Sequence, residues 1–262
     1  MRTLAVLLLV SLVTTLSAAQ EFEVASVKPA VPTRPLGDFG RRAPPGQWNV
    51  VGLTLQEIIT YIYPEFRLPG LLMGGPAWVR ATRFDLQGRM SPTATPAEVK
   101  AMVRRLLEQR FGLRTHTEQR MLDVFVLTLA QPGKPGPGLT PASPVCVEWR
   151  KNGGAVPADC DLQRKGVTAG LTMPVETIAD FITMLSLPAA IPRGPVDRFI
   201  LDRPIVDRTG LDGYFQIVGP SPMASNPSFV SDMERELGLK LTRAREAVDV
   251  MVIESVSMPE PD

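Results

Sequence analysis

Apolar residues recur at helical spacing in four stretches of the chain, and the clearest stretch lies between Thr95 and Gly112. Thr95 and Glu98 have the spacing of a capping box, and Pro96 occupies the first helical position. Gly112 follows the last turn and supplies a left-handed stop. The pattern predicts a helix with one buried face, formed by Val99, Met102, Val103, Leu106 and Leu107.

Three further helices are predicted from the same signals. Thr54 and Glu57 form a second capping-box pattern before an apolar stretch. We expect another helix to begin at Thr172, and a last one to begin at Asn226-Pro227 and end at Gly238. Their buried faces are expected at Ile178, Phe181, Ile182 and Leu185, and at Phe229, Met233 and Leu237.

After each glycine stop the chain continues as two short segments that are typical of strands. Residues 113–119 alternate in polarity and residues 123–130 are nearly all apolar, and residues 239–245 and 248–256 repeat this arrangement. The short gaps predict two antiparallel hairpins, each with a final strand that is central in its sheet or covered on both faces. Further strands are expected at 21–28, 83–90 and 214–218.

The two predicted hairpins belong to an internal repeat with a constant offset of 126 residues. Phe111–Arg114 aligns with Leu237–Lys240, and Asp123–Leu127 aligns with Asp249–Ile253. We interpret the chain as two tandem copies of one small unit, in the order helix, strand, helix, hairpin. The predicted fold class is therefore α+β, with helices packed on one face of a mainly antiparallel sheet.

The repeat divides the chain into six segments. In chain order they are 1–19 (signal peptide), 20–47 (N-terminal strand and proline-rich loop), 48–130 (first α+β unit), 131–168 (linker that carries both cysteines), 169–257 (second α+β unit) and 258–262 (tail). Proline accounts for 26 of the 262 residues, about twice its usual share, which indicates ordered loops between the elements.

The first residues have the form of a secretory signal peptide. Arg2 provides a positive start, Leu4–Leu16 is apolar apart from serine and threonine, and Ser17-Ala18-Ala19 offers the small residues that a signal peptidase reads. We expect cleavage before Gln20 and a mature protein in the periplasm or the medium. An uncleaved anchor is the alternative, but the apolar run is short for a bilayer span and no later stretch of the sequence resembles one.

The charge of the chain bears on its partners. The formal net charge is +1, and removal of residues 1–19 takes away only Arg2 and brings it to 0. A neutral chain without a basic block gives no reason to expect nucleic acid or an anionic membrane as a partner. We expect no cofactor and no bound metal, and the sequence leaves the oligomeric state open.

Cys146 and Cys160 are the only cysteines, and an exported chain meets an oxidising compartment. Their spacing, with Asn152-Gly153-Gly154 between them, predicts a hairpin closed by a disulfide. Closing such a loop stabilises a protein by about 3 kcal/mol in the chain-entropy model. A redox-active pair or a metal site is the alternative, but the pair lacks CxxC spacing and has no histidine nearby.

His116 is the only histidine, so a catalytic triad would have to use it. In the predicted strand it shares a face with Arg114 and Glu118, which indicates a solvent-exposed side chain. The sequence therefore offers no catalytic residue.

Polar residues are densest between Asp202 and Gly213. Asp207, Thr209 and Asp212 can line a cation or ligand site there, because oxygen ligands are those that calcium prefers. The alternative is a pair of turns between two strands, and turn chemistry accounts for every residue type in the segment.

Trp78 is a further candidate ligand-binding residue. It follows Gly74-Gly75-Pro76, a loop that can present an aromatic ring to a partner. Alternatively, the glycines form a tight turn and Trp78 packs over the edge of a sheet. The glycines match neither a dinucleotide fingerprint nor a phosphate-binding loop.

Five motifs spread over the mature chain belong together: Phe22–Pro29, Gly74–Trp78, Phe84-Asp85, Arg110–Leu113 and Val206–Tyr214. With them the chain resembles a secreted, "soil-associated" protein family of unknown function. The sequence departs from that family at Phe215-Gln216, where Asp-Phe is usual. The resemblance implies an extracytoplasmic location. In some relatives this region follows a membrane-bound, antibiotic-sensor-like peptidase domain, which implies sensing.

Two shorter motifs, Pro204–Asp207 and Glu236–Leu239, carry a looser resemblance. Each half of the chain is similar in its order of elements to the short periplasmic domains at the start of secretins and TonB-dependent transducers. Those domains are interaction modules, so this resemblance also implies binding rather than catalysis.

Three functional hypotheses follow. The first is a non-enzymatic interaction or sensing module outside the cytoplasm, which captures an envelope or extracellular protein by adding a strand to an open sheet edge. The second is a secreted hydrolase that uses paired carboxylates from Asp202, Asp207 or Asp212. The third is a small-ligand binder that uses the cleft between the two units.

Overall fold

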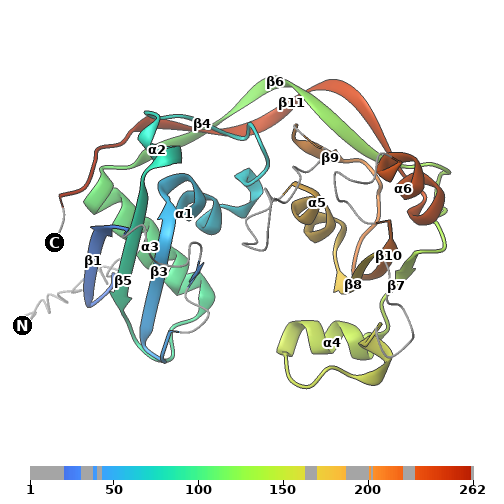
Figure 1. Cartoon of the computed structure of the whole chain (residues 1–262), viewed down its shortest axis with the longest axis horizontal. Helices are drawn as coiled ribbons and strands as arrows, with labels where there is room; N and C mark the ends of the chain where they lie inside the picture. Colours follow the sequence, from blue (N-terminus) through green and yellow to red (C-terminus); the bar gives the residue numbers. More distant parts are fainter. Residues whose placement is uncertain are drawn as a thin grey trace, which may run out of the picture.

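The computed structural model describes residues 21–30, 38–39, 43–162, 170–186, 201, 203–220 and 228–260. Two lobes lie beneath a pair of long strands, β6 (Arg114–Leu129) and β11 (Leu239–Ser255), which run across both lobes (Figure 1). The predicted signal peptide at 1–19 and the candidate carboxylate of Asp202 lie outside the described residues.

The first lobe is an antiparallel sheet with helices packed against it. The strands lie in the order β1-β5-β3-β2, and Phe84, Leu107 and Phe111 are buried between the sheet and the helices. The elements are β1 (Val24–Pro29), β2 (Asp38–Phe39), β3 (Gln47–Thr54), α1 (Leu55–Ile62), a 3-10 turn (Pro64–Phe66), α2 (Trp78–Ala81), β5 (Arg83–Arg89) and α3 (Pro96–Phe111).

The second lobe is smaller and has a separate core. Its strands lie in the order β7-β10-β8, and every apolar residue that the sequence predicts to be buried on its two helices is buried. The elements are β7 (Leu139–Pro141), β8 (Leu171–Glu176), α5 (Ile178–Ser186), β10 (Phe215–Gly219) and α6 (Phe229–Leu237).

The strands β6 and β11 form an antiparallel ribbon that joins the lobes. Short strands flank the ribbon at its two ends, with β4 (Leu72–Gly74) parallel to β11 and β9 (Ile205–Asp207) parallel to β6. The apolar half of each long strand is therefore central in its sheet, as the sequence predicts, and Val124 and Val250 are fully buried.

The two predicted hairpins are wrong, because each hairpin segment is one continuous strand. The stretch Gln119–Asp123, where a turn is expected, contains no glycine, proline or asparagine. Its residues pair instead with β11, from Asp249 to Arg245. The partner of each long strand is thus the other long strand, and not a neighbour in sequence.

The predicted α+β class with mainly antiparallel sheets is confirmed, whereas the tandem duplication stays a prediction. Both α3 and α6 end at a glycine with left-handed backbone, Gly112 at φ 57° and Gly238 at φ 65°. Each glycine leads directly into one of the long strands. In addition, Leu68 packs against the cores of both lobes.

Helix starts agree with the sequence in the first lobe and differ in the second. Complete capping boxes begin α1 at Thr54 and α3 at Thr95. The predicted start at Thr172 is wrong, because this residue lies in β8 and the strand continues to Glu176. The residue before α5 is Thr177, whose hydroxyl and backbone N–H both donate to the Asp180 carboxylate, at 2.7 and 3.0 Å.

The predicted disulfide between Cys146 and Cys160 is present, but the hairpin around it is not. Cys146 lies in α4 (Pro144–Asn152). This helix begins here because Ser143 caps it and Pro144 occupies its first position. Cys160 ends a 3-10 turn (Ala158–Cys160). Both cysteines are buried against Val175 of β8. The bond therefore joins α4 to the 3-10 turn within one small helical segment, and packing against Val175 attaches this segment to the second lobe.

A side chain from β10 also secures this segment. The amide nitrogen of Gln216 donates to the backbone carbonyl of Asp159 at 3.0 Å. In the first lobe, the β5 carboxylate of Asp85 accepts the backbone N–H of Gly52 at 2.8 Å and stabilises an irregularity in β3. Among the described residues, no helix has both the length and the apolar character that a membrane span requires.

Candidate functional site

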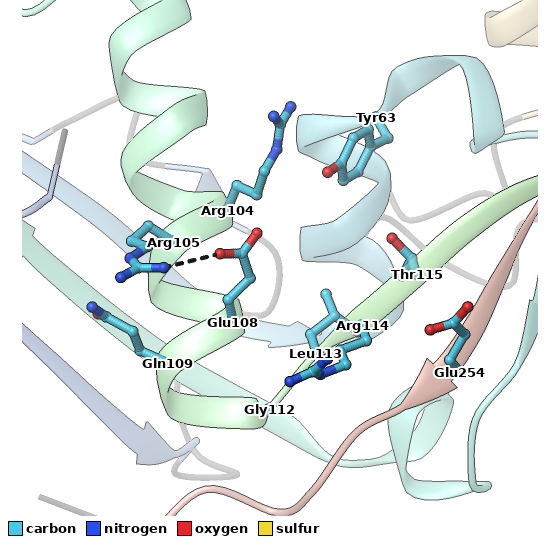
Figure 2. Close-up of a pocket in the computed structure, with 10 residues that line it drawn as sticks. All are labelled: Tyr63, Arg104, Arg105, Glu108, Gln109, Gly112, Leu113, Arg114, Thr115 and Glu254. Atoms are coloured by element: carbon cyan, nitrogen blue, oxygen red, sulfur yellow. Dashed lines mark ion pairs between the residues drawn. The ribbon is translucent and has the colours of Figure 1, made fainter. Parts of the chain in front are cut away.

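A polar groove of about 610 Å³ lies beside α3 in the first lobe (Figure 2). It is bordered by the second half of α3, the residue after α1, the start of β6 and the end of β11. The lining residues are Tyr63, Arg104, Arg105, Glu108, Gln109, Gly112, Leu113, Arg114, Thr115 and Glu254. Its volume falls within the range of small-molecule and cofactor pockets.

Local structure explains how these side chains meet. Tyr63 follows the last turn of α1, where its backbone N–H donates to the carbonyl of Ile59. Arg104 and Glu108 are four residues apart on the exposed face of α3, so they point to the same side of the helix. The left-handed turn at Gly112 then reverses the chain and sets Arg114 at the start of β6.

Arg105 is already paired with carboxylates. Its Nε donates to Glu21 at 3.0 Å, and its terminal nitrogen lies 3.5 Å from Glu108. These hydrogen bonds, above all the one to Glu21, raise the pKa of the Arg105 guanidinium. Gln109 donates to the same Glu21 oxygen at 3.0 Å. One distant carboxylate is therefore bound on this face of α3 by two side chains.

Arg104 and Arg114 differ from Arg105. The Arg104 guanidinium lies over the Tyr63 ring, 4.9 Å from its centroid, in cation–π geometry. Burial raises the pKa of the Tyr63 phenol, and the neighbouring Arg104 charge opposes that shift. Within the described part of the chain, no carboxylate forms an ion pair with either Arg104 or Arg114. The groove thus carries two arginines whose charges are not directly neutralised.

Glu254 closes one side of the groove and binds the only histidine. The Nδ1 atom of His116 lies 2.8 Å from Glu254, and its Nε2 atom lies 3.5 Å from Glu118. The His116 side chain is 42% exposed, which confirms the predicted solvent-facing position. Its immediate partners are carboxylates on the surface of the ribbon.

The predicted cluster after β9 forms two successive turns. The Asp207 carboxylate accepts the backbone N–H of Thr209 at 2.8 Å, and the Thr209 hydroxyl accepts the N–H of Leu211 at 3.2 Å. Asp212 follows on the surface. Among the described residues, no three His, Cys, Asp or Glu side chains are grouped to hold a metal ion. The ligand-binding role of Asp207, Thr209 and Asp212 stays a prediction.

Trp78 is half-buried in the first lobe and lies apart from the Asp207 turn. Its ring stacks near Phe111, with centroids 6.5 Å apart, and meets Phe84 edge-on at 6.2 Å. These contacts make it part of the apolar packing around α2. The structure therefore does not bring Trp78 together with the other candidate residues, and its binding role stays a prediction.

Sequence reasoning missed the groove. The Arg104-Arg105 pair is a visible signal, but on a helix it indicates only a solvated face. Tyr63 and Glu254 are 191 residues apart in the chain and meet at the groove only through tertiary structure. A second hollow, of about 560 Å³, lies on the disulfide-bonded segment beside Val145 and Trp149. It is mainly apolar, in contrast to the charged groove.

The fold and the groove define a two-lobed α+β protein with a disulfide-bonded helical segment and a polar surface groove lined by arginine and glutamate side chains. The chain belongs to the family "Protein of unknown function (DUF3738)", whose family model matches residues 59–256. This agrees with the resemblance to an uncharacterised family. No curated protein and no solved structure matches the chain.

Proposed function

We propose that this protein is an extracytoplasmic, non-enzymatic interaction or sensing module that binds an envelope or extracellular protein partner through the groove beside α3. The observation that carries the proposal is the pair Arg104 and Arg114, which border the groove without carboxylate partners in the described structure. Arginine is enriched among the residues that contribute most to binding at protein interfaces.

Export through the 1–19 signal peptide is part of the same proposal. The disulfide between two fully buried cysteines supports it, because such bonds persist in oxidising compartments. The tandem repeat and the likeness to periplasmic interaction domains also belong here. They are supported by the common offset of 126 residues that relates the two left-handed glycines Gly112 and Gly238.

The terminal strands of the three sheets favour the groove over strand addition to those strands as the capture mechanism. Four terminal strands, β2, β4, β7 and β9, have only two or three residues each. The other two carry residues that blunt an edge, namely Lys28 and Pro29 in β1 and Pro174 in β8, and β7 ends at Pro141. Proline lacks the N–H that a new strand would need, and charged edge residues disfavour pairing.

The two alternatives have less support. A carboxylate hydrolase that used Asp207 would need its carboxylate to act on substrate, but this carboxylate accepts the backbone N–H of Thr209. A ligand site between the units differs in position from the groove, which lies within the first lobe.

Crosslinking in cells tests the proposal. A photo-crosslinker at Thr115, inside the groove, should give a discrete adduct with an envelope or extracellular protein. Combined Arg104→Gln and Arg114→Gln substitutions should abolish that adduct. A control with Arg243→Gln and Arg245→Gln removes the same charge from exposed positions of β11 and should retain it. An adduct that survives loss of both groove arginines would contradict the proposal.

The exported protein should also begin at Gln20, which intact-mass measurement of the purified envelope or secreted form would check. A mass that still includes residues 1–19 would exclude cleavage at the predicted position.

A further inference from the structure

The exposed face of α3 already binds a carboxylate from a distant part of the chain. Both Arg105 and Gln109 donate to the same oxygen of Glu21, each at 3.0 Å. Glu21 is 84 residues from Arg105 in sequence, so this contact is a tertiary one. The spacing of polar donors along this helix is therefore compatible with a carboxylate ligand.

Two more guanidinium groups, those of Arg104 and Arg114, line the groove without such a ligand in the described structure. Arg104 is exposed with its guanidinium over the Tyr63 ring, and a guanidinium can form two parallel hydrogen bonds to a carboxylate. Arg114 stands at the start of β6, at the other end of the groove. Figure 2 shows Arg104 and Arg114 on either side of Glu108.

The alternation of charges restricts what can bind. A compact polyanion placed between the two arginines would meet the Glu108 carboxylate, and like charges in contact repel. An extended chain avoids this conflict, because its acidic side chains can reach Arg104 and Arg114 separately. Its backbone N–H groups can then face Glu108 or Glu254, since carboxylates accept hydrogen bonds from them.

We infer that the groove takes an extended acidic peptide segment of the partner, with one carboxylate on Arg104 and a second on Arg114. This inference rests on the proposed function, for which it names the chemistry of the partner. The peptide lies across the end of α3 and the start of β6, with Tyr63 beneath the first carboxylate contact.

Fluorescence anisotropy of the mature chain with defined probes tests the inference. The main probe is a labelled, end-blocked octapeptide of alternating Glu and Ser, and its matched control replaces every Glu with Gln. Inorganic phosphate and phosphatidylglycerol vesicles represent the other sources of negative charge. We expect the Glu–Ser peptide to bind and the Gln–Ser peptide to bind at least tenfold more weakly.

Substitutions at the two arginines give the specific readout. Arg104→Gln and Arg114→Gln should each weaken Glu–Ser binding by about tenfold, as loss of a charge-assisted hydrogen bond predicts. The Arg243→Gln and Arg245→Gln control should bind as the parent does. Arg104→Lys should recover only part of the affinity, because lysine keeps the charge but not the two parallel donors.

Tyr63 provides a second, independent signal. Its pKa is raised by burial and lowered by Arg104, so a carboxylate that neutralises Arg104 should raise the pKa further. Absorbance titration near 295 nm, with Tyr63→Phe as the reference, should show this increase with the Glu–Ser peptide and not with the Gln–Ser peptide. An unchanged Tyr63 titration at saturating peptide would overturn the placement of the first carboxylate.

The inference and the proposed function fail in different ways. Arginine-dependent crosslinking of a partner, together with equal binding of both peptides, would leave the function standing and overturn the acidic segment. Arginine-dependent binding of phosphate or vesicles in place of the peptide would do the same. Peptide binding without any arginine-dependent crosslink would support the acidic segment and remove the proposed function.

Discussion

Met121 of β6 and Ala247 of β11 are paired across the ribbon, and they are 126 residues apart. This separation equals the offset that aligns Gly112 with Gly238 in the sequence. On one side of this pair the first part of β6 lies opposite the last part of β11, and on the other side the last part of β6 lies opposite the first part of β11. This register is compatible with the predicted duplication, because a twofold axis between two copies would pass through such a pair of equivalent positions.

Each long strand of the ribbon contributes buried side chains to the core of the lobe in which it does not begin. Leu127 of β6 packs in the core of the second lobe, although β6 follows α3 of the first. Val250 and Ile253 of β11 pack in the core of the first lobe, although β11 follows α6 of the second. Each core therefore depends on a strand that begins in the other lobe, and Glu254 reaches the groove by this route.

The two helix-stop glycines should differ in their tolerance of a side chain. A Cβ on Gly238 would lie 2.5 Å from the backbone nitrogen of Gly136, whereas on Gly112 it would lie 3.3 Å from the Ser257 hydroxyl. Both positions have positive φ, so an alanine costs about 1–2 kcal/mol from backbone strain alone. Urea unfolding should show that loss for Gly112→Ala and a larger loss for Gly238→Ala.

Gly210 supplies the control for these substitutions. Its φ is also positive, at 67°, and nothing lies within 4 Å of the position that an alanine methyl group would take, so Gly210→Ala reports strain without a clash. Equal losses at Gly238 and Gly210 would show that the contact with Gly136 is unimportant.

Removal of the disulfide should loosen α4 more than the rest of the protein. Replacing both Cys146 and Cys160 with serine opens a loop with a sequence separation of 14 and should cost about 3 kcal/mol of stability. Hydrogen exchange should accelerate first in α4, because the disulfide joins this helix to the 3-10 turn that follows it. The groove is in the other lobe, so binding of the acidic peptide should be retained. Uniform acceleration in both lobes would contradict a local role.

The cap of α5 should make stability depend on pH in the acid range. Burial opposes ionisation of Asp180, but hydrogen bonds from the Thr177 hydroxyl and N–H outweigh it, and the pKa of Asp180 lies below its ordinary value. A lowered folded-state pKa contributes stability that is present above the unfolded pKa, about 4, and is lost as pH falls through the folded value. Unfolding free energies measured from about pH 6 down to about pH 2 should show this loss.

Two substitutions isolate that contribution. Asp180→Asn should remove this component of the acid-range pH dependence, and Thr177→Ala should cost about 1 kcal/mol at neutral pH through loss of the cap. An unchanged pH profile in Asp180→Asn would assign the acid sensitivity to other carboxylates.

The Asp85 carboxylate should stabilise the protein as an acceptor for the backbone of β3. Asp85→Ala leaves the backbone N–H of Gly52 without this partner and should cost about 1–3 kcal/mol. Asp85→Asn retains an acceptor and should cost less. Thermal unfolding of the two variants would check the order, and a greater loss in Asp85→Asn would refute it.

Local signals in the sequence determined the caps of several elements. The capping boxes at Thr54 and Thr95 and the stops at Gly112 and Gly238 are where the sequence places them. These features depend on hydrogen bonds and backbone angles within a few residues, so the local sequence is sufficient to predict where these helices begin and end. The disulfide partners also follow from the sequence, because the chain has only two cysteines.

The tertiary structure alone decided the ribbon and the groove. A strand's side-chain pattern does not say which other strand completes its hydrogen bonds, so β6 and β11 could be assigned to hairpins until their pairing was known. The groove combines Tyr63, Arg104 and Glu254 from three separate elements, and its charge balance depends on which arginines already have carboxylate partners. Such pairing is a property of the folded arrangement, because it depends on distances between residues far apart in the chain.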